Sequence, residues 1–162
     1  MSTELDLKRR SFVLSAAVVA AAAVAGSVGV DPKSRWYRSL RKPDWQPPAQ
    51  AFGLVWTPLY AAIAWSGGRT LSRISPAERS GYVGTFAVNL VLNAGWNWLF
   101  FRARSPLAGL VGIAALNVSN AQLIKKTTAT DRAAAAALLP YAAWCGFATA
   151  LNASIWRLNR HE

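Results

Sequence analysis

Residues 133–156 read AAAAALLPYAAWCGFATALNASIW and contain no Asp, Glu, Lys or Arg. A helix rises about 1.5 Å per residue and the hydrocarbon core of a bilayer is about 30 Å thick, so this stretch is long enough to span a membrane. Four further stretches share the property, namely residues 11–30, 45–68, 80–101 and 105–124. A soluble domain would need charged residues on the outer face of most of these elements. The pattern predicts an all-α integral membrane bundle of five transmembrane helices.

Proline, glycine and charged residues mark the expected helix ends. Gly67-Gly68 suits the end of the second helix, and Ser75-Pro76 suits an N-cap followed by a proline at the first helical position. Pro58 and Pro140 lie inside the second and fifth helices and predict kinks, because each removes an N–H. We predict a single domain, residues 1–162, with a polar connector at 31–46 as a lid and helices at about 11–30, 47–67, 77–101, 106–125 and 131–157.

Basic residues are concentrated at the N-terminus and in the short connectors. The chain carries 18 Lys+Arg against 7 Asp+Glu, a formal net charge of +11. Basic residues that flank apolar spans suit anionic lipid headgroups, so we expect membrane lipids and not nucleic acid as the partner of this charge. The Lys and Arg residues divide equally between the two sides of the predicted bundle. They therefore predict neither an orientation nor which membrane holds this multi-pass protein.

The cysteine and histidine content excludes several kinds of site. One cysteine, Cys145, excludes an intrachain disulfide. One histidine, His161, excludes a His/Cys metal cluster and axial haem ligation by histidine inside the bundle. Because the five spans hold no carboxylate and no basic side chain, a proton relay, an ion pump and acid–base hydrolysis lack their usual groups. We expect no metal and no required cofactor.

The N-terminal segment has two interpretations. Lys8-Arg9-Arg10, followed by Ser-Phe-Val-Leu and an Ala/Val run, resembles a twin-arginine signal peptide, and Ala23-Val24-Ala25 resembles a cleavage site. The charge-free run at 11–30 is long for the apolar part of a signal peptide and suits a first transmembrane helix. We favour the helix, with a cleaved signal over residues 1–25 as the alternative.

The residues of the predicted spans that could form a binding site are aromatic and amide side chains. The chain has 8 Trp, and an aromatic belt at the membrane surface explains those near span ends better than it explains the mid-span Trp56 and Trp144. Amides in lipid must point inward and find partners, so helix–helix contact is one interpretation of Asn89 and Asn93. The other is a cavity lined by aromatics and amides, which suits a flat, largely apolar ligand such as a tetrapyrrole or a sterol. Helical spacing groups Phe52, Trp56 and Tyr60 on one face, Asn89 and Asn93 on a second, and Tyr141, Trp144 and Ala148 on a third.

Four ordered motifs resemble those of a known family. WYRSLRKPDWQPP at 36–48 and FGLVWTPLY at 52–60 are similar to the first loop and second helix of the translocator protein and tryptophan-rich sensory protein family, TspO/MBR. NLVLNAGWNWLFF at 89–101 resembles its third helix, and PYAAWCGFATALNASIW at 140–156 resembles its fifth. The motifs stand at the family's spacing and together extend over most of the chain. The chain resembles a bacterial-type member.

The resemblance implies a five-helix bundle, commonly a homodimer, that binds porphyrins and in some members cholesterol or benzodiazepine-type ligands. In members that degrade protoporphyrin IX in light, the reactive tryptophans match Trp56 and Trp144. The family usually has Gln where Asn89 stands, and its cholesterol motif near the end of the fifth helix lacks its Tyr here. The predicted ligand-binding set joins the matching pocket residues with Trp36 and Tyr141, and comprises Trp36, Trp45, Phe52, Trp56, Tyr60, Asn89, Asn93, Tyr141, Trp144 and Ala148.

Three functions follow from the residues and the resemblance. The first is a membrane-embedded binding protein for porphyrins (protoporphyrin IX or haem) that senses or regulates tetrapyrrole metabolism and stress. The second is a light-dependent porphyrin-degrading enzyme that uses Trp56 and Trp144 as its reactive residues. The third is a transporter of porphyrins, sterols or other lipids, although the absence of charge within the spans argues against coupled transport.

Two further expectations concern partners. Cations of the lid can pair with porphyrin propionates or with lipid headgroups, and these are Lys33, Arg35, Arg38, Arg41 and Lys42. Small residues on the third helix allow close approach of a second helix, which predicts a homodimer through Gly81, Gly84 and Ala87.

Overall fold

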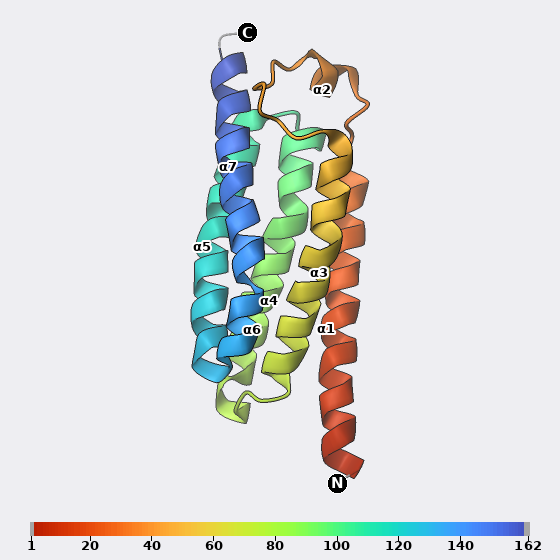
Figure 1. Ribbon diagram of the computed structural model, residues 1–162, viewed down its shortest axis with the longest axis vertical. Helices are drawn as coiled ribbons and strands as arrows, with labels where there is room; N and C mark the ends of the chain where they lie inside the picture. The colour runs from red at the N-terminus through yellow and green to blue at the C-terminus, as the bar shows by residue number, and fades with distance from the viewer. Residues whose placement is uncertain (1, 161–162) are drawn as a thin grey trace.

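The computed structural model describes residues 2–160, so His161 lies outside it (Figure 1). Every regular element within these residues is a helix, which confirms the all-α prediction. Long helices run up and down side by side, and the two ends of the chain lie at opposite ends of the bundle (Figure 1). The elements in chain order are α1 (Ser2–Gly29), α2 (Arg35–Ser39), α3 (Ala49–Leu71), α4 (Pro76–Asn97), η1 (Trp98–Arg102), α5 (Pro106–Thr130), α6 (Arg132–Ala137) and α7 (Leu139–Asn159).

The helices have the dimensions of membrane spans. Three segments are long and apolar enough to cross a membrane, namely Leu5–Gly29, Pro106–Thr130 and Arg132–Asn159, the last of which comprises α6 and α7. Between them run α3 and α4, of 23 and 22 residues, each about 33 Å long. α1 packs against α3 and α4, and α5 packs against α4 and α7. The chain is thus a helical bundle of a multi-pass integral membrane protein.

Several element boundaries differ from the predicted ones. α1 begins at Ser2 instead of residue 11, because nothing in the charged segment before Ser11 breaks a helix, and this segment extends beyond the other helices (Figure 1). The third span ends in a π-helical turn, η1, in which the Ala103 N–H donates to the Trp98 carbonyl at 2.9 Å. The predicted connector contains the short helix α2, which Ser34 caps by accepting from the Tyr37 N–H at 3.2 Å.

The two prolines inside the predicted spans have different consequences. The fifth span divides at Leu138, because Pro140 has no N–H to donate to the carbonyl of Ala136. α6 ends with a hydrogen bond from the Leu138 N–H to the Ala135 carbonyl, at 3.0 Å, and α7 begins at the next residue. α3, in contrast, runs through Pro58 as one helix.

α1 is packed into the bundle along α3. The Ser15 hydroxyl donates to the carbonyl of Ala64 at 2.8 Å, and Ser15 is 1% exposed. Gly68 allows this approach, since a Cβ atom there would lie 2.8 Å from the Cα of Phe12. The segment that resembles a signal peptide therefore forms one wall of the fold, as the transmembrane interpretation expects. The residues predicted for a homodimer face lie elsewhere, exposed along α4, and are Gly81, Gly84 and Ala87.

Asp131 joins the bundle at the end opposite the lid. Its Oδ2 pairs with Arg69 Nε at 2.9 Å and with the guanidinium of Arg73, and its Oδ1 accepts from the Ala134 N–H at 2.9 Å. The hydrogen bond from Ala134, together with the two arginines, lowers the pKa of this carboxyl to about 2 although burial opposes the shift. One side chain therefore caps α6 and ties it to the end of α3.

We expect Asp131→Asn to weaken this junction, because asparagine keeps the cap and loses the charge that pairs with Arg69 and Arg73. A loss of about 1 kcal/mol corresponds to a fall in Tm of about 2–4 °C for a chain of this size. Since the folded pKa of Asp131 is lowered, its contribution is present above the unfolded pKa near 4 and disappears as the pH falls toward 2. Thermal melting in detergent across this pH window should show the Tm difference between wild type and variant shrinking as the pH falls. A Tm difference that stays constant would contradict the role given to the Asp131 charge.

Candidate functional site

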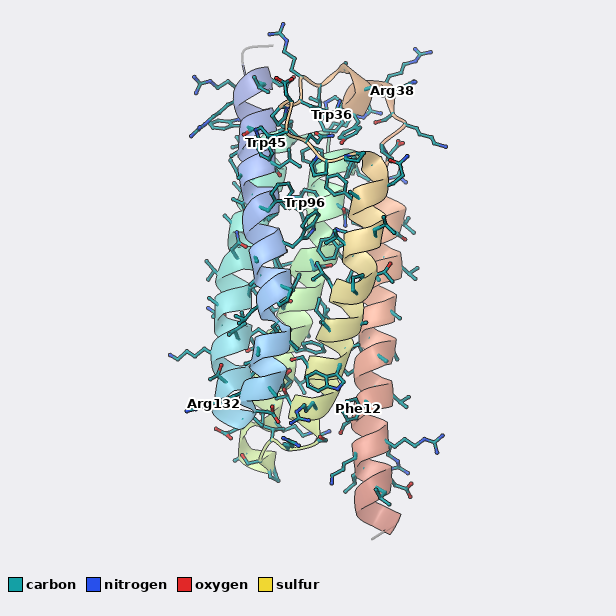
Figure 2. The ribbon with its side chains drawn as sticks, in the orientation of Figure 1. Phe12, Trp36, Arg38, Trp45, Trp96 and Arg132 are labelled. Carbon is teal, nitrogen blue, oxygen red and sulfur yellow. The ribbon has the colours of Figure 1, made fainter. Side chains whose placement is uncertain are left out.

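A cavity of about 460 Å³ lies beneath the lid, between the upper halves of the long helices. Its walls come from α1, the connector, α3, α4, η1 and α7. Figure 2 shows Trp96 of α4 below Trp36 and Trp45 of the connector, with α3 and α7 on either side. None of the residues that line the cavity is charged; they are Ala23, Ser27, Val30, Pro32, Tyr37, Gln46, Ala49, Phe52, Gly53, Trp56, Tyr60, Trp96, Asn97, Phe100, Phe101, Ala148, Leu151, Asn152 and Ile155.

Stacked aromatic pairs form two of the cavity walls. Trp56 and Tyr60 stack on α3 with their ring centroids 5.1 Å apart, and Trp96 stacks on Phe100 at 5.5 Å. The Trp96 indole N–H donates to Asn152 Oδ1 at 3.1 Å, which fixes the plane of the ring. Aromatic faces with few polar groups suit a ligand that is itself flat and largely apolar.

A chain of buried hydrogen bonds continues from the cavity into the bundle. The Tyr60 hydroxyl donates to Asn93 Oδ1 at 2.9 Å, and Asn93 Nδ2 donates to the Tyr141 hydroxyl at 3.1 Å. Tyr141 donates in turn to Asn89 Oδ1 at 3.1 Å, and Asn89 Nδ2 donates to Asn120 Oδ1 at 2.7 Å. Of these residues only Tyr60 lines the cavity. Asn89, Asn93 and Tyr141 lie beneath the cavity and hold α4, α5 and α7 together.

Three predicted tryptophans form an outer aromatic layer. Trp144 stacks on Phe147 at 5.0 Å and lies edge-on to Phe52 at 5.9 Å. Trp45 is 49% exposed and meets Phe147 at 5.8 Å, while Trp36 meets Phe100 at 5.7 Å. None of the three lines the cavity. Trp144 and Trp36 contact the lining residues Phe52 and Phe100, whereas Trp45 contacts Phe147, which does not line it. The structure thus brings four predicted residues to the cavity wall, namely Phe52, Trp56, Tyr60 and Ala148.

Several lining residues lie outside the predicted set. Tyr37, Trp96, Phe100 and Asn152 all occur in the four motifs, so the signal that could have found them was present. Trp96 and Asn152 each follow a predicted site residue by about one helical turn or less, at 93 and 148. Gln46 stands between Trp45 and two prolines in the predicted connector, where residue type alone gives no signal.

The lid is attached to the end of α7 by a reciprocal pair of hydrogen bonds. The Arg41 N–H donates to Asn159 Oδ1 at 2.9 Å, and Asn159 Nδ2 donates to the Arg41 carbonyl at 2.9 Å. Beneath the lid the Tyr37 ring packs on Phe101 at 5.2 Å. These contacts hold the lid over this end of the bundle.

The lid cations do not line the cavity. The Lys42 ammonium donates to the carbonyls of Tyr37 at 2.6 Å and Leu40 at 3.1 Å, and lies 4.5 Å from the centre of the Tyr37 ring. Burial lowers the pKa of Lys42. The other four cations are exposed, and Arg38 lies at the outer edge of the lid in Figure 2; they are Lys33, Arg35, Arg38 and Arg41.

Comparison with known proteins agrees with this architecture. The profile of the TspO/MBR family matches residues 13–157. The tryptophan-rich protein TspO of Chlorobaculum tepidum is 36% identical over 133 residues, which cover 79% of this chain and 82% of that protein. The human translocator protein is 34% identical over 77% of this chain and 75% of its own length.

A third relative extends the similarity to nearly the whole chain. Protein CrtK of Rhodobacter capsulatus is 31% identical over 155 residues, which cover 94% of this chain and 96% of that protein. The region matched by the family profile includes α1 from Val13 onward, the other long helices and the lid. The chain is therefore a member of the TspO/MBR family of multi-pass integral membrane proteins.

Proposed function

We propose that this protein binds porphyrins or related flat tetrapyrroles within the bilayer and takes part in sensing or regulating them. The observation that carries the proposal is the uncharged, aromatic-walled cavity of about 460 Å³ beneath the lid. Its volume falls within the range of small-molecule sites, roughly 300–1,000 Å³. A macrocycle with delocalised electrons gains dispersion and stacking energy against indole and phenyl rings.

The placement of the aromatic pairs favours a flat, rigid ligand over a ligand that is long and flexible. Trp56 and Tyr60 present one stacked surface from α3, and Trp96 and Phe100 present another from α4 and η1. The hydrogen bond from Tyr60 to Asn93 and the bond from Trp96 to Asn152 hold both surfaces in place before a ligand arrives. Preorganised walls reduce the entropy cost of binding.

The first test is an absorbance titration of protoporphyrin IX with the purified protein in detergent. We expect Trp56→Ala to weaken binding about tenfold, which corresponds to about 1.4 kcal/mol, because it removes one of the stacked surfaces. Trp65→Ala is the matched control, since Trp65 lies on the same helix, is 41% exposed and contacts Arg69 instead of the cavity.

Two outcomes would contradict the proposal. If wild-type protein leaves the porphyrin spectrum unchanged, the cavity does not take this ligand. If both tryptophan variants weaken binding equally, the porphyrin associates with the protein surface or the detergent and not with the cavity.

A second function, light-dependent porphyrin breakdown, draws support from one observation. Trp56 stands in the cavity wall, stacked on Tyr60 and 6.1 Å from the Tyr141 ring, so an oxidisable indole would touch the bound macrocycle. Trp144 does not line the cavity, but it contacts the lining residue Phe52. Illumination of the complex in air should then bleach porphyrin faster with wild type than with Trp56→Phe, and equal rates would argue for binding alone.

A further inference from the structure

The exposed part of the cavity lining is confined to one side of the bundle. The lining residues that are exposed all lie at the end of α1, in the connector just after it or at the beginning of α3, and they are Ser27, Val30, Pro32, Ala49 and Gly53. The lining residues from α4, η1 and α7 are buried or half-buried. The cavity therefore reaches the surface between the lid ends of α1 and α3, through a gap that we call the lateral opening.

The contact between α1 and α3 is tight away from the lid and loose near it. Far from the lid, Ser15 donates to the Ala64 carbonyl at 2.8 Å, and a Cβ atom at Gly68 would lie 2.8 Å from the Cα of Phe12. Near the lid, a Cβ atom at Gly53 of α3 would meet nothing within 4 Å. The two helices that touch closely at Gly68 thus leave Gly53 uncovered.

The lid end of α1 is held against η1 and not against α3. The Trp98 indole N–H donates to the Ala25 carbonyl at 2.9 Å, and the Arg102 guanidinium donates to the Val28 carbonyl at 3.0 Å. A Cβ atom at Gly29 would lie 3.0 Å from Cδ1 of Trp98, so the backbone of α1 packs closely on this ring. α1 cannot swing toward α3 and close the lateral opening without breaking both hydrogen bonds.

The surroundings of the lateral opening are those of the hydrocarbon layer. Its five residues are uncharged, and the hydroxyl of Ser27 already donates to the Val24 carbonyl at 2.7 Å. Beside it, Val24 of α1 is 63% exposed and Leu54 of α3 is 75% exposed, as suits side chains that face lipid. Asp31 is the first charged residue after the apolar run of α1, so the opening lies at the edge of the apolar layer, just inside the headgroups.

We propose that the lateral opening is the entrance through which flat, apolar ligands dissolved in the bilayer reach the cavity. Such ligands concentrate in lipid, and a sideways route spares the macrocycle a passage through water. The route from water would pass the lid, which the two hydrogen bonds between Arg41 and Asn159 attach to α7. The inference deepens the proposed function and rests on it, because it names the lipid phase as the source of the ligand.

The test measures the rates at which protoporphyrin IX quenches tryptophan fluorescence of the full chain in phosphatidylcholine vesicles. We expect Gly53→Phe and Ser27→Phe, on opposite sides of the lateral opening, each to slow association about tenfold. Dissociation, followed after addition of excess empty vesicles, should also slow several-fold, because a barrier on the route hinders exit as well as entry. Crowding of the binding site itself would have the opposite effect and speed dissociation.

Leu54→Phe is the matched control, since Leu54 adjoins Gly53 on α3, receives the same new side chain and does not line the cavity. Its rates should equal those of wild type. Asn159→Ala tests the route beneath the lid, because it removes both bonds to Arg41. Entry through the lateral opening predicts an unchanged association rate for this variant.

Three results would overturn the lateral opening while porphyrin binding stands. They are faster association in Asn159→Ala, association as fast as wild type in either Gly53→Phe or Ser27→Phe, and faster dissociation in both of these variants. If wild type does not bind protoporphyrin IX at all, the proposed function fails and the entrance fails with it.

Discussion

Replacing Gly68 with valine should destabilise the protein by about 3 kcal/mol and lower its Tm by about 6–12 °C. The physical reason is the crossing of α1 and α3, where a Cβ atom at Gly68 would lie 2.8 Å from the Cα of Phe12. A flexible side chain can rotate away from such a contact, but a backbone atom cannot. α1 must therefore move as a whole, which also strains the bond from Ser15 to the Ala64 carbonyl.

Gly146→Val is the matched control for this prediction. A Cβ atom at Gly146 would meet nothing within 4 Å, and the residue is exposed on α7, so we expect a change of at most about 0.5 kcal/mol. Thermal unfolding in mild detergent, followed by tryptophan fluorescence, measures both variants. If Gly68→Val melts like wild type, α1 does not pack on α3 in the mature protein, and cleavage of residues 1–25 as a signal becomes the better interpretation.

The sequence predicted the helical architecture because lipid imposes one strong constraint. Charged residues are excluded from long stretches, and this exclusion located the five long helices that residues 2–160 form. The same signal could not locate the start of α1, because Lys8, Arg9 and Arg10 lie in a helix that continues beyond the rest of the bundle (Figure 1). Charge marks where a helix leaves the apolar layer, and not where the helix itself ends.

The cavity is lined by all the residues predicted for the site on α3, by one of those on α7 and by none of those on α4. Spacing of four residues put Phe52, Trp56 and Tyr60 on one face, and that face lines the cavity. On α4 the amides of Asn89 and Asn93 both bond the Tyr141 hydroxyl inside the bundle, while Trp96 of the next turn reaches the cavity. Which turn faces the cavity depends on how the helices rotate against each other, which one sequence does not specify.

Two lid residues that line the cavity show the same limit more sharply. Tyr37 and Gln46 lie nine positions apart in a connector without regular pattern, and their meeting depends on the fold of the lid. That fold is held by Asn159 from the far end of the chain and by the carbonyl contacts of Lys42. Local residue preferences carry no information about such distant contacts.

Ala148→Phe should abolish most porphyrin binding, with a loss of affinity of at least about 50-fold, or about 2.3 kcal/mol. Ala148 lines the cavity from α7, opposite the aromatic surface of Trp56 and Tyr60 on α3. A benzyl group at this position occupies the space that the macrocycle needs. Because the new side chain fills an existing cavity and does not overpack the core, the Tm should stay at or above that of wild type.

Ala150→Phe separates occlusion of the cavity from the general effect of a large side chain on α7. Ala150 is exposed two residues further along the helix, so its phenyl ring would point into lipid and leave the affinity unchanged. Absorbance titrations of both variants with protoporphyrin IX give the comparison. A 50-fold loss confined to Ala148→Phe, with an unchanged melting curve, places the ligand inside the bundle; undiminished binding by that variant means that the porphyrin occupies another surface, and that the aromatic walls serve only to pack the helices.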